Sequence, residues 1–262
     1  MSYQKDGLLG QIAIVTGATA GLGRAVALKL AADGAGIVVT GRNMVAGGEL
    51  VRLIKGAGGE AVYFGADIED GVQARDMVSR AIAHFGRVDI MVASAGASTA
   101  AQGIFSDIDP SAVAEQVART IRIKLNPVHA VLPHMLERKC GAILFITSEG
   151  GRFPTPGQTT VALHSAGLIM AAKVMAKELS RSLVRVNTLS VTLVEDTPIH
   201  QRFESGNLNP IRQKVYQKIV AQAPFGLAKP ENIADVAAFL VSNASSHVTG
   251  ATLSATGGAT YS

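Results

Sequence analysis

Short apolar runs alternate along the chain with longer segments in which apolar residues recur at helical spacing. The apolar runs predict buried strands at residues 12–15, 37–40, 61–65, 88–93, 142–146, 184–189 and 251–253. Helices are predicted at residues 22–30, 44–55, 72–85, 111–138 and 159–182. Strands and helices in this order predict one α/β domain, residues 1–262, with about seven parallel strands doubly wound by helices on both faces.

One region departs from the alternation. Residues 192–213 are polar and punctuated by proline, and they follow the carboxyl end of the predicted sixth strand. In open parallel sheets, ligands bind beyond the carboxyl ends of the strands. We therefore expect this region to form a lid or substrate loop.

The first predicted strand leads into a glycine-rich turn and then a helix. Gly17, Gly21 and Gly23 follow the apolar run and Thr16, and helical spacing begins at Leu22. A strand, a glycine turn and a helix together present unpaired amides and the positive helix end, which is a phosphate site. The alternative is a tight turn whose glycines serve only the backbone.

Composition and charge narrow the function classes. The chain has 262 residues, 48% hydrophobic and 17% charged, and a formal net charge of +4 with no basic run, so nucleic-acid binding is not expected. A single cysteine, Cys140, excludes an internal disulfide framework. Neither a signal segment nor an uncharged run of membrane-spanning length is recognised, so we expect a cytoplasmic protein with no membrane partner. No metal site is predicted.

With these motifs, nearly the whole chain resembles a short-chain dehydrogenase/reductase, which implies a Rossmann-type fold and a nicotinamide dinucleotide. Residues 16–23 match the family's TGxxxGxG loop, residues 93–96 stand in place of NNAG, and residues 224–258 resemble its C-terminal segment. Asp67 matches the family aspartate that contacts adenine. The resemblance assigns cofactor contacts to Thr16, Gly17, Thr19, Gly21, Leu22, Gly23, Arg42, Asp67, Ile68, Ser94, Ala95 and Gly96.

The end of the second strand bears on which nucleotide is bound. Family members that prefer NAD carry an aspartate where this chain has Gly41, followed by Arg42. A carboxylate repels a 2′-phosphate, whereas a guanidinium binds one with two parallel charge-assisted bonds. Arg42 therefore favours NADP(H) over NAD(H), unless it only caps a surface loop.

The family's catalytic positions are mostly replaced. The resemblance implies a serine, a Tyr-x-x-x-Lys pair on one helix face and an asparagine on the preceding helix. Ser148 aligns with the serine, whereas Val161 stands at the tyrosine, Ser165 at the lysine and Thr120 at the asparagine. Because the family lysine also holds the nicotinamide ribose, Ser165 predicts weakened cofactor binding.

Other side chains are candidates for the lost functions. His164 lies on the same helical turn as Val161, and a histidine can titrate near neutral pH, although packing against a neighbouring helix or subunit explains it as well. Lys124 could supply positive charge, or lie at a subunit interface. Tyr216 belongs to the expected lid and could swing inward.

Two hypotheses remain open. The chain is a nucleotide-binding or silent-subunit homologue with a degenerate site, impaired in ordinary carbonyl/alcohol redox chemistry. Alternatively, it is an active NAD(P)(H)-dependent oxidoreductase of an unknown small-molecule substrate, with a non-standard proton donor. Apolar residues around the helices at 121–136 and 161–175 predict a homotetramer or homodimer under either hypothesis.

Overall fold

The computed structural model describes residues 7–96, 101, 103–205 and 210–260. In these residues one parallel sheet of seven strands has the order β3-β2-β1-β4-β5-β6-β7. Its strands are β1 (Ile12–Thr16), β2 (Gly36–Thr40), β3 (Ala61–Tyr63), β4 (Ile90–Ala93), β5 (Gly141–Ser148), β6 (Val184–Val191) and β7 (Thr252–Ala255). The predicted doubly wound parallel sheet is confirmed.

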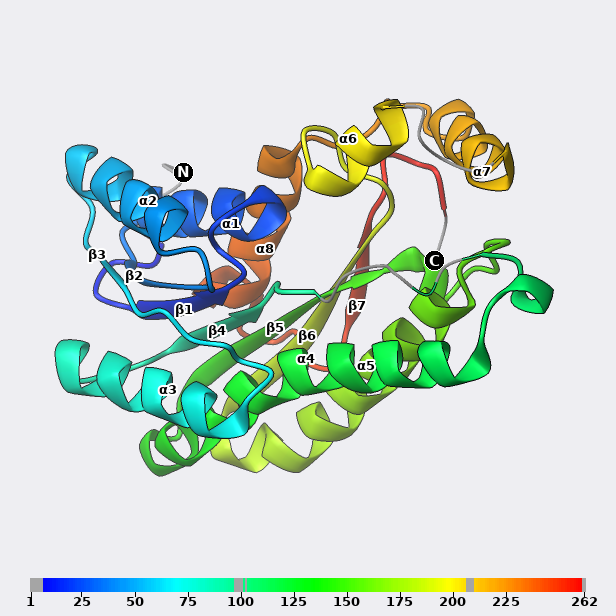
Figure 1. The fold of residues 1–262 in the computed structure, drawn as a ribbon. Coiled ribbons are helices and arrows are strands. Elements are labelled where there is room, and N and C mark those ends of the chain that lie inside the picture. The colour runs from blue at the N-terminus through cyan, green and yellow to red at the C-terminus, as the bar shows by residue number, and fades with distance from the viewer. Residues whose placement is uncertain (1–6, 97–100, 102, 206–209, 261–262) are drawn as a thin grey trace.

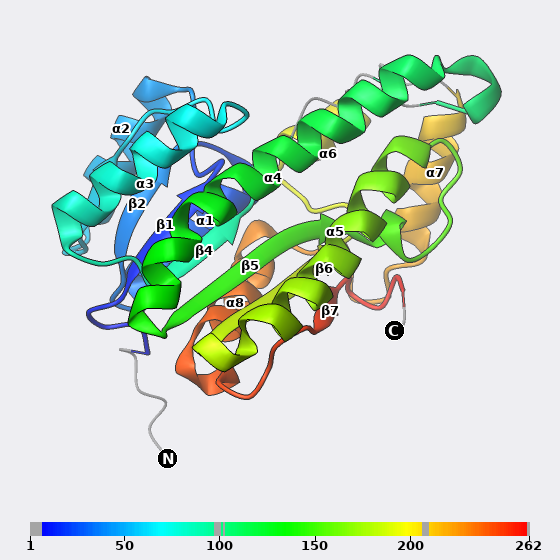
Figure 2. The ribbon, with the colours of Figure 1, turned by 90° about the horizontal axis from the view of Figure 1, so that it is seen from below.

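Eight α-helices accompany the sheet in the described part of the chain. They are α1 (Gly21–Ala32), α2 (Met44–Gly56), α3 (Gly71–Phe85), α4 (Pro110–Arg138), α5 (Thr159–Leu179), α6 (Pro198–Glu204), α7 (Pro210–Ala221) and α8 (Pro230–Val241). Helices α1, α2 and α8 cover one face of the sheet, and α3, α4 and α5 cover the other (Figure 1). Viewed from below, α4 and α5 lie side by side along β5 and β6 (Figure 2).

The two faces of the sheet bury two separate apolar clusters. Because side chains alternate along a strand, Val15 and Leu144 enter the cluster under α1 and α8. Their neighbours Ile14 and Phe145 enter the cluster under α3, α4 and α5. Burial on both faces explains the continuous apolar runs from which the strands were predicted.

Local capping fixes several helix boundaries. Asn43 caps α2 by accepting from the Ala46 amide, and Asp70 caps α3 by accepting from the Val72 amide at 2.7 Å. Asp109 caps α4, and Pro110 occupies the first helical turn, where a missing N–H costs little. These short polar residues act where their side chains replace absent backbone partners.

The structure changes several of the expected boundaries: β3 ends two residues before the predicted strand 61–65 does, and β4 begins two residues after the start of the predicted strand 88–93. Strands β5 and β6 run two residues further than predicted, because the ladder continues through the pair Ser148 and Val191. Part of the expected loop at 192–213 is helical, since α6 and α7 lie in or extend from it, while residues 206–209 fall outside the described part. The helix α8 had no prediction of its own.

Helix α5 and its continuation, Thr159–Ser182, form a segment long and apolar enough by composition to cross a membrane. Core helices of soluble proteins pass the same test. Here 33% of the apolar window is buried, and Leu168, Ala172 and Ala176 of α5 are packed in the cluster under the sheet.

Candidate active site and cofactor site

The glycine turn after β1 is packed so closely that Gly17 and Gly23 have no room for side chains. Gly17 and Gly21 have φ of +67° and +52°, the left-handed region that favours glycine. A Cβ on Gly17 would lie 2.8 Å from the Ala95 Cα, and one on Gly23 would lie 2.7 Å from the Gly17 carbonyl carbon. Backbone packing therefore requires these glycines whether or not a ligand binds.

The same turn also has the features of an anion site. Helix α1 begins beside Gly21, and its N-cap residue, Ala20, provides no side-chain hydrogen bond to the first-turn amides. Unsatisfied amides at a helix N-terminus bind phosphate. The compact turn and the uncapped helix together fit the pyrophosphate of a dinucleotide.

Thr16 joins this turn to the neighbouring strand end. Its hydroxyl donates to the Val92 carbonyl at 3.3 Å and accepts from the Ala95 amide at 3.2 Å. The segment Ser94–Gly96 is thereby held against the glycine turn, as expected for residues contacting one cofactor.

The adenosine end of the expected site lies beyond β2 and β3. A Cβ on Gly41 would lie 3.0 Å from the Thr19 methyl group, so an aspartate at this position would press on the glycine turn. Arg42 is exposed at the end of β2. Asp67 accepts from the Glu69 amide at 3.2 Å and Ile68 is buried, which places both beside the carboxyl end of β3.

Ser148 and Val161 are brought together, as the family resemblance implies. The Ser148 hydroxyl accepts from the Gly150 amide at 3.2 Å. A Cβ on Gly150 would lie 3.5 Å from that hydroxyl and 3.3 Å from Cγ1 of Val161. The two side chains therefore border one point at the end of β5, to which Val161 offers only methyl groups, and Oε1 of Gln158 lies 3.0 Å from the same point.

The side chains at the other two replaced positions, Ser165 and Thr120, are buried. Ser165 is 0% exposed, and its hydroxyl lies 3.2 Å from Nδ1 of His164. The Thr120 hydroxyl donates to the Gln116 carbonyl at 2.9 Å within α4. The Thr120 hydroxyl is bonded within its own helix, and the base beside Ser165 is an imidazole whose pKa is lowered to about 4, too weak to activate a hydroxyl.

Lys124 lies in the interior, not at a subunit interface. Its amine donates to the carbonyls of Ala93 at 2.7 Å and of Ile146 at 2.8 Å, and burial lowers its pKa to about 7. The sequence carried a signal for this position: Lys124 lies four residues before Val128 and eleven before Met135, both buried on the same helix face.

His164 is affected by the same surroundings. Burial lowers its pKa to about 4, and the charge of Lys124 contributes to the lowering. At neutral pH its imidazole is therefore uncharged, a form that accepts a proton more readily than it donates one.

Sequence reasoning missed a buried carboxylate next to Ser148. Glu149 is 3% exposed and accepts from the Ser254 hydroxyl at 2.7 Å and the Thr260 hydroxyl at 3.1 Å. The Arg152 guanidinium lies 3.5 Å from it. An acidic residue directly after an apolar strand, with arginine three residues later, was the available signal.

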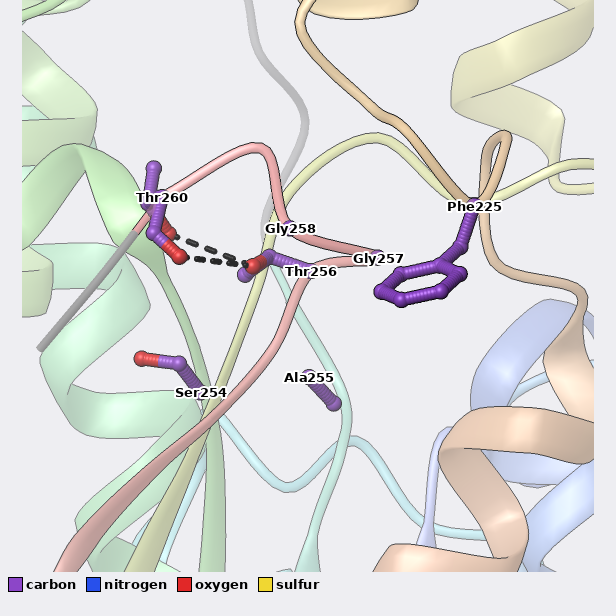
Figure 3. A pocket seen from close by; sticks show the side chains of 7 residues that line it. All are labelled: Phe225, Ser254, Ala255, Thr256, Gly257, Gly258 and Thr260. Carbon is purple, nitrogen blue, oxygen red and sulfur yellow. Dashed lines mark hydrogen bonds between the residues drawn. The ribbon is translucent and has the colours of Figure 1, made fainter.

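This cluster adjoins a pocket of about 430 Å³ at the carboxyl end of β7. The hydroxyl side chains of Ser254, Thr256 and Thr260 lie on one side, and the ring of Phe225 lies on the other (Figure 3). Because β6 pairs with both β5 and β7, the pocket lies two strands from Ser148.

The lid lies over the glycine turn. A Cβ on Gly21 would lie 3.5 Å from Cδ of Pro198, the first residue of α6. Tyr216 of α7 stacks on Phe203 of α6 with 5.4 Å between ring centroids. In this conformation Tyr216 therefore joins the two lid helices.

Comparisons with known proteins agree with this geometry. Residues 17–260 match the family described as "Enoyl-(Acyl carrier protein) reductase". The chain is 29% identical to 3-oxoacyl-[acyl-carrier-protein] reductase FabG of Thermotoga maritima, over 96% of this chain and 98% of the relative. It is 32% identical to human (3R)-3-hydroxyacyl-CoA dehydrogenase, over 98% of both chains.

A solved structure gives the same result. The structure of 7 alpha-hydroxysteroid dehydrogenase complexed with NADH and 7-oxo glycochenodeoxycholic acid superimposes with a TM-score of 0.88 and 29% identity, covering 98% of each chain. These matches cover nearly the whole chain. The chain also has the seven-stranded parallel sheet and the glycine-rich turn described above. The chain belongs to the short-chain dehydrogenase/reductase family of oxidoreductases.

Proposed function

We propose that this chain is an NADP(H)-binding family member with a degenerate active site, acting as a nucleotide-binding protein or as the silent subunit of an assembly. One observation carries the proposal: at the point across Gly150 that the Ser148 hydroxyl borders, the chain places Val161 and the amide oxygen of Gln158, and no tyrosine. Where the family has a phenol that exchanges a proton with the substrate oxygen, this chain has two methyl groups.

The loss extends to the group that would activate a phenol. An unperturbed tyrosine has a pKa near ~10, and a neighbouring ammonium group stabilises its anion. Ser165 stands in the place of that ammonium group and is fully buried. Removal of an acid/base group alone lowers the rate about 10²- to 10⁴-fold, so ordinary carbonyl/alcohol chemistry is impaired here.

The cofactor contacts are retained in this proposal. The amides of the glycine turn bind the pyrophosphate, Asp67 and Ile68 contact the adenine, and Ser94–Gly96 line the nicotinamide end. A nicotinamide dinucleotide supplies or accepts a hydride when bound. Arg42 favours the 2′-phosphate of NADP(H). Thr19 fills the space that an aspartate side chain at position 41 would need.

The proposal includes self-association and a cytoplasmic location. Leu163, Met170 and Val174 form an exposed apolar stripe on α5, with exposed fractions of 53%, 59% and 49%. A second copy of the chain is the partner that would cover this stripe and form a homodimer or homotetramer.

Titration with NADPH and NADH, followed by single-turnover assays over a panel of carbonyl compounds, tests the proposal. We expect binding that is tighter for NADPH and turnover below the usual enzymatic range. Failure of both cofactors to bind would overturn the nucleotide-binding role. Turnover above about 1 s⁻¹, an ordinary enzymatic rate, would overturn the degenerate site and favour an active oxidoreductase with another proton donor.

A further inference from the structure

The buried amine of Lys124 lies directly behind the residues that would surround the nicotinamide. One of its hydrogen-bond acceptors, the Ala93 carbonyl, immediately precedes Ser94. The other, the Ile146 carbonyl, lies two residues before Ser148, which is roughly 7 Å along a strand. The amine thus joins the ends of the two strands that lead into the proposed nicotinamide and substrate positions.

Nothing in the described residues neutralises this amine directly. Lys124 is 5% exposed and makes no ion pair with a carboxylate there. Its helix neighbours Arg119 and Arg122 are paired with Glu69 instead. A buried positive charge without a counter-ion has a long reach, because little water screens it.

Other ionisable groups lie on the helices packed around Lys124, and buried Glu149 follows Ser148; of these groups, His164 is the one whose pKa the charge of Lys124 lowers. Strands β4 and β5 carry none. Helix α5 contributes His164, whose imidazole is uncharged above a pKa of about 4. On α3, Asp76 pairs with Arg80, and the ring of His84 packs against Phe64 and Phe85. Across the neutral range, the charge of Lys124 itself therefore changes.

The hydrogen bonds at Lys124 do not require it to be charged. An ammonium group has three N–H donors and a neutral amine has two, so both carbonyls remain bonded in either state. A change of protonation therefore alters the electrostatic potential at the strand ends without removing a structural contact.

We propose that Lys124 sets the redox preference of the bound nucleotide: in its charged form it repels the positively charged nicotinamide of the oxidised cofactor and leaves the neutral reduced form unaffected. This inference rests on the proposed nucleotide binding. Lys124 acts by charge at a distance and takes no part in proton transfer.

The sign of the pH dependence follows from the two charge states. Burial lowers the pKa of Lys124 to about 7, so the amine is mainly charged in mildly acidic solution and mainly neutral in mildly alkaline solution. NADP⁺ should bind weakly when the amine is charged and more tightly once it is neutral. Titration of the 2′-phosphate is common to NADP⁺ and NADPH and cancels in the ratio of their dissociation constants.

The test is the ratio of the dissociation constants of NADP⁺ and NADPH between about pH 6 and about pH 8.5, by calorimetry and NADPH fluorescence. In the natural protein we expect the ratio to fall roughly tenfold, as for unit charges about 10 Å apart at an effective dielectric of about 20. In Lys124→Met, which keeps the length without the charge, we expect the low ratio at every pH. In Lys124→Arg, we expect the high ratio at every pH.

The possible failures are distinguishable. If neither nucleotide binds the natural protein, the proposed function is overturned and this inference with it. If both bind with a ratio that does not change with pH, only the inference is overturned. If Lys124→Met melts at a lower temperature but keeps the natural pH dependence of the ratio, Lys124 is structural and the inference is likewise overturned.

Discussion

Gly23 packs directly on the backbone of Gly17: a Cβ at position 23 would lie 2.7 Å from the Gly17 carbonyl carbon and closer still to its oxygen. The first turn of α1 therefore rests on the glycine turn itself. One hydrogen-to-methyl change at Gly23 tests whether the uncapped helix end is the anion site that we infer.

We expect Gly23→Ala to displace the glycine turn and lower NADPH affinity at least about tenfold, because the helix amides then point away from the pyrophosphate. NADPH fluorescence titration measures the effect. Gly48→Ala is the matched control: it lies within α2, a Cβ there meets nothing within 4 Å, and it should raise stability by up to ~1 kcal/mol. Equal NADPH affinity in both variants would contradict the assignment.

The choice between NADP(H) and NAD(H) depends on Arg42. We expect Arg42→Ala to weaken NADPH binding at least about tenfold, the size of one lost charge-assisted bidentate contact, and to leave NADH binding unchanged. Calorimetric titration with both nucleotides measures the two constants. Arg52→Ala removes another exposed arginine, on α2, and should alter neither. An equal loss for both nucleotides would show that Arg42 acts on structure and not on the 2′-phosphate.

The sequence was enough to predict where the glycine turn and Ser148 lie at the ends of their strands. It did not predict the surroundings of the buried charged residues. The glycine turn and Ser148 follow apolar runs, so local pattern was enough to place them, whereas position 161 came from the interval that the family resemblance implies. Lys124 and Glu149 were missed or misplaced because their partners are distant in sequence. The Ile146 carbonyl and the Ser254 hydroxyl become their neighbours only when β5, β7 and α4 assemble.

Asp89 lies at the amino end of the sheet and couples folding to pH. Its side chain is buried; burial raises its pKa, but hydrogen bonds from Arg87, the Ile12 amide and Arg138 outweigh that effect and hold the pKa below the ordinary value. In the unfolded chain the pKa of an aspartate is about 3.9. A lower pKa in the folded state stabilises the fold above that pH, and the stabilisation is lost as the pH falls through the folded-state pKa.

We therefore expect Asp89→Asn to destabilise the protein by about 1.5–3 kcal/mol at neutral pH, the size of lost hydrogen bonds to a charged group, because Arg87 and Arg138 stay partly solvated. The difference from the natural protein should shrink in acid, where Asp89 is protonated. Urea unfolding at neutral pH and in acid measures both. Asp76→Asn breaks an exposed pair with Arg80 and should cost less than ~1 kcal/mol. A loss for Asp89→Asn that is the same in acid would refute the charge argument.

Self-association is tested on the exposed stripe of α5. We expect Met170→Glu to convert the oligomer to smaller species, because a charge would have to be buried without a partner at the interface. Light scattering after gel filtration measures the mass. Val45→Glu on α2 is the control, since Val45 is 69% exposed and Met170 59%. A natural protein that is already monomeric would contradict the expected assembly.

The last prediction concerns the two replaced side chains beside Ser148. We expect Val161→Tyr with Ser165→Lys to raise single-turnover carbonyl reduction about 10²-fold or more, because the phenol and its activating ammonium group return to one helix face. Val161→Tyr alone, without the ammonium group, should gain less. Ser165 is fully buried, so thermal unfolding of each variant must accompany the rates. A stable double variant that binds NADPH but reduces carbonyls no faster than the natural chain would show that the scaffold has lost substrate binding as well as proton transfer.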